Sequence, residues 1–285
     1  MVVLSTGVCV FTMLPHPYTA ARALLSLPGP GERSVQVVAH PDDDLLFMSP
    51  DLFGPVAHGG PSVTIFLTAG ESVAGLADGH DPHAYARERE AGVRAAYAWL
   101  AGVPDSWRSR TIVAGGVPVR LDELDRRPGI GLVFAGLPDG GDPRAYGGRH
   151  ALTRAWSDGA CVRRFGSWIP GCLTRAQVVG MLRALYARFR PTVLRTLDPH
   201  PAGQPADHPD HVASARFAAA AATDLPVRTV AYQGYTVTPR PANVMGALRV
   251  LKRKVFEIYR RHDYRAHGGG RYHSWIGRMY GWQTR

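Results

Sequence analysis

Lysine is almost absent from this chain of 285 residues: only Lys252 and Lys254 are lysines, and every other basic residue is an arginine. Because many alanines and glycines accompany the arginines, this imbalance indicates GC-rich coding as much as function. The formal net charge of +10 is spread along the chain and predicts no nucleic-acid surface. The one dense basic cluster, residues 252–261, is typical of a solvated helix face, with binding of an anionic ligand as the alternative.

Long apolar runs and a disulfide framework are also missing. No apolar run reaches the roughly 18 residues that a transmembrane helix needs. The cysteines are Cys9, Cys161 and Cys172, and an odd number argues against a set of paired bridges. Cys161 and Cys172 bracket the loop-like segment RRFGSWIPG and could pair if the protein is exported, while two free thiols fit the sequence equally well.

The N-terminus lacks the mark of a secretory signal. Its apolar stretch, VVLSTGVCVFTML, has no preceding lysine or arginine, as such a signal requires. We therefore expect residues 1–33 to be an N-terminal extension and the protein to be cytoplasmic. Export is the alternative, if residues 1–20 act as a signal peptide. Residues 34–285 have a length that suits a single domain.

Short apolar segments alternate with helical patterns. Strands are expected at 35–39, 63–68, 131–137, 191–197 and 227–233, and helices at 82–100, 176–190, 209–222 and 246–261. Residues 111–121 indicate a hairpin or a bent strand. This alternation predicts an α/β, Rossmann-like fold whose mostly parallel sheet has helices on both faces.

Polar motifs follow the expected strands. They are AHPDDD (39–44), LTAGE (67–71), GLPDGGD (136–142) and RTLDPHP (195–201). Parallel strands bring their carboxyl ends to one edge, where ligands bind in such sheets, so we expect a metal site there. The long segment 142–174, rich in Gly, Trp and Arg, is expected to be an insertion or lid at the same rim.

Two motifs, AHPDDD and DHPDH, indicate metal chemistry. Three adjacent aspartates repel one another when buried, unless a cation compensates their charge. DHPDH at 207–211 supplies further ligands, because Pro209 suits the first position of a helix and makes His208 its N-cap. His208 and His211 then point to one side of the helix start. Two histidines, one carboxylate and an open position are typical of a catalytic zinc, one per chain.

Each motif also has an ordinary explanation. HPDD alone could begin a helix with an acidic first turn, and HPDH alone could be a capped helix start. Two histidines and a carboxylate also bind non-haem iron in oxygenases. Those enzymes have double-stranded β-helix folds, which the alternation of strands and helices argues against. In the zinc interpretation, Asp42 stays free beside a ligating Asp43 and is the natural base.

At these residues the chain resembles the LmbE-like, or PIG-L-like, N-deacetylases. The family's motifs are AHPDDE and HPDH, matched here by AHPDDD and by HPDH at 208–211. LTAGE, REREA (87–91), GLPDG and VLRTLDPH extend the resemblance, which covers residues 34–235. The resemblance implies a zinc-dependent hydrolase that removes the acetyl group from an N-acetyl sugar, usually N-acetylglucosamine.

The resemblance also implies roles for individual residues. The implied metal ligands are His40, Asp43 and His211. The implied catalytic residues are Asp42 as general base, His208 as oxyanion stabiliser and donor to the leaving amine, and Asp210 as the residue that orients His208. The implied substrate contacts are Arg87 and Asp139, although Arg87 could pair with Glu90 on a helix face and Asp139 could belong to an ordinary turn.

Two positions depart from the family pattern. Asp44 stands where the family usually has Glu, which shortens a side chain in the second shell around the metal. Ala206 stands two residues before the HPDH histidine, where some members have a tyrosine, so no hydroxyl there can assist the oxyanion.

The substrate is narrowed by a resemblance to one branch of the family. HPDDDLLFMSPD (40–51) and WIGRMY (275–280) are similar to an actinobacterial branch that includes deacetylases of teicoplanin-type glycopeptide pseudoaglycones. The resemblance implies a small-molecule glycosylated substrate. From the spread of the arginines we expect no nucleic-acid partner and little membrane contact. Inositol, glycan or glycolipid conjugates of N-acetylglucosamine are alternatives, as is a catalytically dead, metal-dependent sugar-binding protein. The sequence does not indicate an oligomeric state.

Overall fold

The computed structural model describes residues 31–139, 151–165, 171–268 and 270–284. Its strands are β1 (Ser34–Val38), β2 (Ser62–Thr68), β3 (Trp107–Ala114), β4 (Val117–Leu124), β5 (Arg127–Leu137), β6 (Val162–Arg163), β7 (Cys172–Leu173), β8 (Val193–Leu197), β9 (Arg228–Tyr232) and β10 (Gly281–Gln283). Its α-helices are α2 (Asp43–Phe47), α3 (Phe53–Ala57), α4 (Pro82–Leu100), α5 (Ala151–Ser157), α6 (Arg175–Phe189), α7 (Pro209–Ala221), α8 (Gly246–Tyr259) and α9 (Gly270–Ile276). The expected extension 1–33 lies almost wholly outside the described residues, as do 142–150 and 166–170 of the expected insertion.

A central sheet organises the molecule. Within the described residues it has eight strands in the order β10-β9-β8-β1-β2-β5-β4-β3. The five strands from β9 to β5 run parallel, whereas β3, β4 and β10 are antiparallel to their neighbours. The expected mostly parallel α/β sheet is confirmed, and 111–121 falls in the β3–β4 hairpin.

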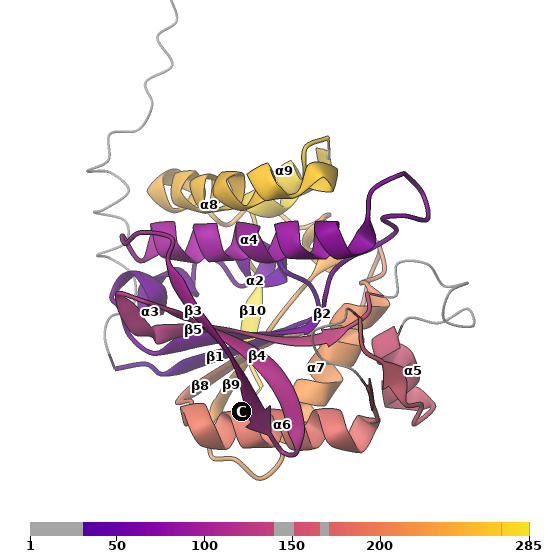
Figure 1. Cartoon of the computed structure of the whole chain (residues 1–285). Coiled ribbons are helices and arrows are strands. Elements are labelled where there is room, and N and C mark those ends of the chain that lie inside the picture. Colours follow the sequence, from indigo (N-terminus) through magenta and orange to yellow (C-terminus); the bar gives the residue numbers. More distant parts are fainter. Residues whose placement is uncertain (1–30, 140–150, 166–170, 269, 285) are drawn as a thin grey trace, which may run out of the picture.

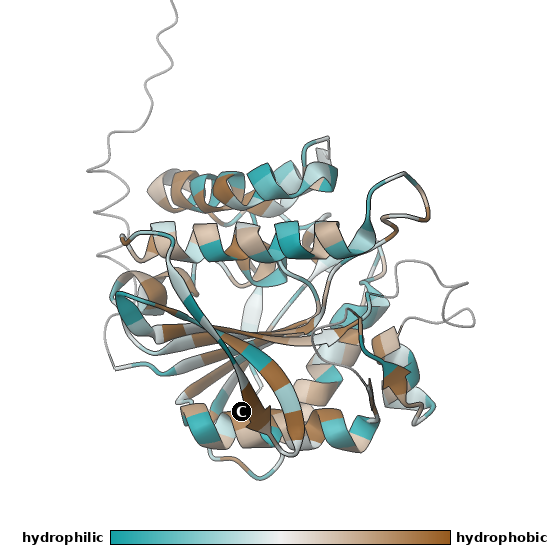
Figure 2. Ribbon diagram, viewed as in Figure 1, coloured by the Kyte–Doolittle hydropathy of each residue, from teal (hydrophilic) through white to brown (hydrophobic). Residues whose placement is uncertain are grey.

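Helices cover both faces of this sheet. Helices α2, α3, α4, α8 and α9 lie over one face, and α5, α6 and α7 lie over the other (Figure 1). Side chains alternate along each strand, so that Val37 belongs to the core on the α6 side and Val38 to the core on the α4 side. Figure 2 shows hydrophobic residues along the strands and both hydrophobic and hydrophilic residues on each long helix.

Local signals fix the two helices that matter for the site. Helix α4 begins at Pro82, after the N-cap Asp81, whose side chain accepts a hydrogen bond from the Ala84 backbone amide. Helix α7 begins at Pro209, and His208 is its N-cap, as the sequence predicts. Gly92 lets α4 cross α8 closely, because a Cβ there would lie 2.8 Å from the Tyr259 carbonyl oxygen.

Several elements were not foreseen from the sequence. Short helices α2, α3, α5 and α9 and edge strand β10 have too few residues for a clear periodicity. A disulfide joins Cys161 to Cys172 beside the small β6–β7 ribbon, which decides between the pair and the free thiols. Among the described helices, none combines the length and the apolar composition that crossing a bilayer requires.

Candidate active site

The carboxyl end of β1 lies where the strand order reverses. The chain continues from β1 to β2 and β5 on one side, and it places β8 and β9 on the other. Ligands bind at such switch points in parallel sheets. His40 follows β1, and His211 lies in the first turn of α7, which follows β8. The two motifs therefore meet: the ring centroids of His40 and His211 are 5.3 Å apart, and those of His40 and His208 are 4.8 Å apart.

Asp43 lies between two of these histidines. Its Oδ1 is 3.0 Å from His211 Nε2, and its Oδ2 is 3.3 Å from His40 Nδ1. All three side chains are buried. Burial alone raises the pKa of the Asp43 carboxyl, but His211 and His40 outweigh it and hold that pKa well below its usual range. Asp43 is therefore an anion, as a metal ligand must be.

Two buried histidine nitrogens of the cluster face carboxylates and fit a cation. His40 Nε2 lies 3.5 Å from Asp139 Oδ1 and His211 Nε2 lies 3.0 Å from Asp43 Oδ1, but neither nitrogen makes a hydrogen bond of good geometry to a described residue. His40, His208 and His211 each offer a ligand atom within 4.8 Å of the others, and so do His40, Asp139 and Asp210. Histidine nitrogens and a carboxylate at this spacing suit zinc or a similar divalent metal. The structure thus brings together the three predicted ligands, His40, Asp43 and His211.

Asp207 orients His211. Its Oδ1 is 2.8 Å from His211 Nδ1, which leaves the Nε2 lone pair for a metal. Gly234 makes room for this pair, because a Cβ there would lie 2.5 Å from Asp207 Oδ1 and 2.7 Å from His211 Nδ1. The sequence reasoning gave Asp207 no role. Its spacing of four residues from a helical histidine is the signal that could have found it.

Asp42 is held by a buried arginine. Arg89 Nη2 is 2.7 Å from Asp42 Oδ1. Burial raises the pKa of the Asp42 carboxyl to about 6, although the Arg89 charge opposes this. A carboxylate with such a pKa can take a proton near neutral pH and release it again.

Arg89 also ties distant segments together. Its guanidinium donates to the Gly70 carbonyl and to the Tyr259 hydroxyl, each at 2.7 Å, and lies 3.3 Å from Asp263. The sequence reasoning chose Arg87 from the RERE motif. The structure does not bring Arg87 to the histidine cluster, because residues two apart on a helix point roughly 200° apart. Arg87 is exposed on the other side of α4, and its substrate contact stays a prediction.

His208 has a defined neutral form. Its Nδ1 accepts a hydrogen bond from the Asp210 backbone amide at 3.2 Å, so Nε2 carries the hydrogen when the ring is neutral. Burial, followed by the charges of His40 and His211, lowers the pKa of His208 to about 3. Asp210 therefore orients His208 through its backbone, while its carboxylate lies 3.8 Å from His40 Nε2.

Asp139 and Asp44 are also buried, and their roles stay predictions. Asp139 Oδ1 is 3.5 Å from His40 Nε2, and Glu71 accepts a hydrogen bond from the Asp139 amide at 3.0 Å. Asp44 is fully buried and accepts a hydrogen bond from the Tyr97 hydroxyl at 2.6 Å. Burial raises the pKa of the Asp44 carboxyl to about 7.

A cavity of about 490 Å³ opens in front of these groups and is called the central cavity here. Its inner wall carries His40, Asp42, Asp43, Arg89, Asp139 and His208. Its outer wall comes from the C-terminal part of the chain and carries Tyr235, Asp263, Arg265, Arg271, Tyr272 and Trp275. The Tyr235 and Trp275 rings stack at 4.8 Å, and Tyr235 also contacts His211 at 4.9 Å. The sequence reasoning missed this aromatic wall.

The family model of PIG-L, GlcNAc-PI de-N-acetylase, matches residues 35–222. This span includes every residue of the inner wall and ends before the outer wall begins. No curated protein matches the chain significantly.

Three solved structures are similar to this chain at low identity. N,N'-diacetylchitobiose deacetylase from Pyrococcus horikoshii is 17% identical, with a TM-score of 0.49 over 89% of this chain and 82% of that one. The conserved protein TT1542 from Thermus thermophilus is 19% identical, with a TM-score of 0.46 over 86% and 85%. The teicoplanin deacetylase Orf2, in a zinc-inhibited form, is 15% identical, with a TM-score of 0.45 over 84% and 88%. Identities and TM-scores this low do not identify the substrate of this chain.

Proposed function

Since the chain belongs to the PIG-L family of GlcNAc-PI de-N-acetylases and is a metal-dependent N-deacetylase, we propose that it uses zinc to hydrolyse the acetamide of an N-acetylglucosaminyl group. The products are acetate and a free amino sugar. The observation that carries this proposal is the buried His40–Asp43–His211 cluster with Asp42 at its side. His40, Asp43 and His211 would hold a zinc ion, which would supply water activation and polarise the acetamide carbonyl.

Asp42 is the proton carrier in this mechanism. Its pKa of about 6 lets its carboxylate accept the proton of the attacking water near neutral pH. Arg89 fixes the carboxylate and keeps it ionised before the attack. The protonated Asp42 then returns its proton to the nitrogen of the leaving amine.

His208 serves as a neutral hydrogen-bond donor. Because its Nδ1 is occupied by the Asp210 amide, its Nε2–H is the group that donates to the developing oxyanion. The low pKa of His208 argues against a charged imidazolium in the resting enzyme. We therefore assign the amine proton to Asp42, a role that the resemblance gives to His208.

We propose a glycopeptide pseudoaglycone as the acceptor that carries the sugar. The support is the aromatic outer wall of the central cavity, where the partly exposed Tyr272 lies beside the exposed Arg271. A partly exposed aromatic ring offers apolar surface to a sugar or to an aromatic acceptor. The substrate in this proposal is a small glycosylated molecule, and neither nucleic acid nor a membrane takes part.

Mass spectrometry of the zinc-loaded protein with matched substrates tests the proposal. One reaction contains an N-acetylglucosaminyl glycopeptide pseudoaglycone, and the other contains methyl N-acetylglucosaminide. Loss of one acetyl mass from the glycopeptide, abolished in Asp42→Asn, supports both the reaction and the acceptor. Loss only from the simple glycoside supports the reaction and rejects the glycopeptide. Loss from neither, while an inositol or lipid conjugate reacts, moves the activity to that acceptor.

A further inference from the structure

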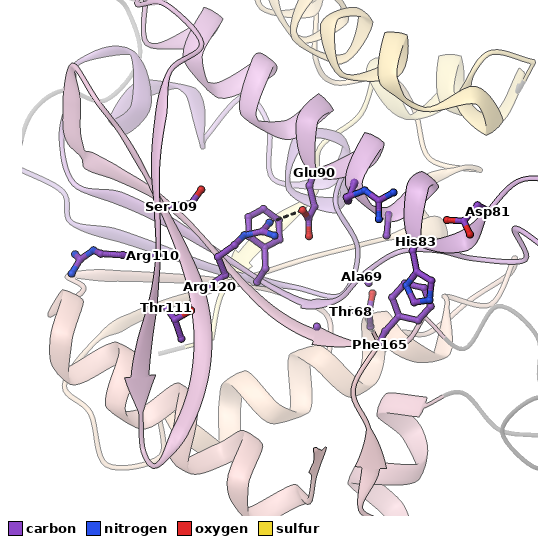
Figure 3. A pocket seen from close by; sticks show the side chains of 14 residues that line it. Thr68, Ala69, Asp81, His83, Glu90, Ser109, Arg110, Thr111, Arg120 and Phe165 are labelled. Carbon is purple, nitrogen blue, oxygen red and sulfur yellow. Dashed lines mark hydrogen bonds and ion pairs between the residues drawn. The ribbon is translucent and has the colours of Figure 1, made fainter. Parts of the chain in front are cut away.

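A second cavity, of about 830 Å³, lies on the other side of α4 and is called the lateral cavity here (Figure 3). Helix α4 forms one wall, and residues of β3, β4 and β5 form the floor. Thr111, Arg120 and Phe134 stand side by side across these three strands. Figure 3 shows Glu90 and Arg120 joined across the middle, with His83 and Phe165 at one end.

Helix α4 separates the two cavities with its two faces. His83, Arg87 and Glu90 follow the i, i+4, i+7 spacing and line the lateral cavity. Tyr85 and Arg89 lie on the opposite face and line the central cavity. The same helix that holds the proposed base therefore also builds the neighbouring cavity.

Phe165 is fixed at the rim of the lateral cavity. Its backbone amide donates to the Gly136 carbonyl at 2.7 Å. The neighbouring Arg164 is buried and donates to the carbonyl oxygens of Ala135 and Pro118, each at 2.7 Å. The Cys161–Cys172 disulfide closes the segment that carries both residues. Phe165 stacks on His83 at 4.3 Å, so a flat pair of rings borders the cavity.

One arginine of the lateral cavity, Arg87, has no partner among the described residues. Of its three arginines, Arg120 is paired with Glu90 and Asp122, and Arg110 is paired with Glu123. Asp81 is used as the N-cap of α4. Arg87 is exposed and makes no hydrogen bond or ion pair with any other described residue. A carboxylate from a ligand is the natural partner for such a guanidinium.

We propose that the lateral cavity is an acceptor subsite that takes an aromatic carboxylate, with the ring on the Phe165–His83 pair and the carboxylate on Arg87. This inference rests on the proposed function in that the same substrate presents its N-acetyl sugar to the central cavity. It places the substrate contact expected of Arg87 on the acceptor.

The segment after β2 and the end of β5 contribute residues to both cavities. Thr68, Ala69 and Gly136 line the lateral side, and Ser72 and Asp139 line the central side. Three residues of chain, from Ala69 to Ser72, span at most about 10 Å.

Direct binding tests the subsite without turnover. The probe is the glucosaminide of 4′-hydroxybiphenyl-4-carboxylic acid, which has no acetyl group to lose, and its methyl ester is the matched neutral probe. Isothermal titration calorimetry compares the zinc-loaded wild type with Arg87→Ala, Arg87→Lys and Phe165→Ala. Arg188→Ala, an exposed helical arginine on α6, is the control.

The two probes and the variants together form a thermodynamic cycle that isolates the contact between Arg87 and the carboxylate. The wild type binds the acid about tenfold more tightly than the ester, and Arg87→Ala removes this preference because the charge-assisted bond is gone. Arg87→Lys restores part of it, Phe165→Ala weakens both probes, and Arg188→Ala changes neither. Equal binding of acid and ester by the wild type, or an unchanged preference in Arg87→Ala, overturns the subsite. Acid preference without deacetylation of any N-acetyl conjugate keeps the subsite and rejects the proposed function instead.

Discussion

Arg89 and Asp42 form a buried ion pair, with 2.7 Å between Nη2 and Oδ1, at the wall of the cavity that holds the histidines. Both side chains are less than a tenth exposed. The pair links α4 to the turn after β1, and Tyr259 and Asp263 also contact the Arg89 guanidinium. The position and the charge of the proposed base thus depend on residues far away in the sequence.

Replacing Arg89 by Met is expected to move the acid limb of kcat/KM to higher pH. The Arg89 charge lowers the pKa of the Asp42 carboxyl against the effect of burial, so its removal raises that pKa. The base is active only when ionised, and more alkaline solution is then needed. Arg89→Lys keeps the charge and is expected to keep the limb closer to that of the wild type. If the acid limb of kcat/KM lies at the same pH in Arg89→Met as in the wild type, Arg89 does not set the pKa of Asp42.

Asp42→Asn is expected to retain zinc and to lose turnover by about two to four orders of magnitude. The amide has almost the same shape but accepts no proton. Metal content by inductively coupled plasma mass spectrometry and acetate release check the two halves of this prediction. Asp43→Asn is the matched variant and is expected to lose the metal. Loss of zinc in Asp42→Asn but not in Asp43→Asn would exchange the two roles.

The sequence was sufficient for the parts of the site that local signals and strand order determine. AHPDDD and HPDH follow β1 and β8, which are neighbours in the sheet, so His40, Asp43 and His211 meet as expected. The bounds of α4 follow from the Asp81–Pro82 start and from Gly102 after its last turn. These features depend on backbone rules that a single sequence displays.

Contacts between distant segments could not be predicted in this way. Either arginine of RERE could face the site until the rotation of α4 about its axis was known. That rotation depends on packing against α8, and Gly92 and Tyr259 meet there. The outer wall around Tyr272 and Trp275 comes from short helices without a clear pattern.

Asp207→Ala is expected to weaken zinc binding by about one to two orders of magnitude. The carboxylate fixes the ring and the tautomer of His211, and without it Nε2 is not held toward the metal. Competition with a chromogenic chelator measures the affinity. Asp224→Ala, an exposed carboxylate beyond the far end of α7, is the control and should bind zinc as the wild type does. Equal affinity in both variants would remove Asp207 from the metal centre.

Cys161→Ser is expected to weaken binding of the biphenyl carboxylate while zinc content and turnover of methyl N-acetylglucosaminide persist. The disulfide closes the segment that carries Phe165, and its loss lets that segment leave the lateral cavity. Calorimetry of Cys161→Ser, and of the wild type in reducing buffer, checks this. A loss of turnover on the simple glycoside would instead indicate that the disulfide supports the central cavity.

The last prediction concerns Lys252, whose ammonium is fully buried between α8 and α9. Its Nζ donates to the carbonyl oxygens of Trp275 and Arg278 at 3.2 and 2.7 Å, and so it holds the segment that carries the Trp275 ring. Burial lowers the pKa of Lys252 to about 7, with a smaller opposing effect from Asp51. In the unfolded chain the pKa of this lysine returns to about 10.4.

Between these two pKa values the unfolded chain binds one more proton than the folded protein. The contribution of Lys252 to the free energy of unfolding therefore rises from pH 7 to pH 10, by at most about 1.4 kcal/mol per pH unit. Lys252→Met cannot titrate and is expected to lose this rise. It is also expected to be less stable at pH 9, because two buried carbonyls lose their donor. Urea unfolding of both proteins at pH 7, 8 and 9 measures the difference, in which other titrating groups cancel. Parallel curves for the two proteins would mean that Lys252 keeps its proton when folded, and that its charge is compensated inside the protein.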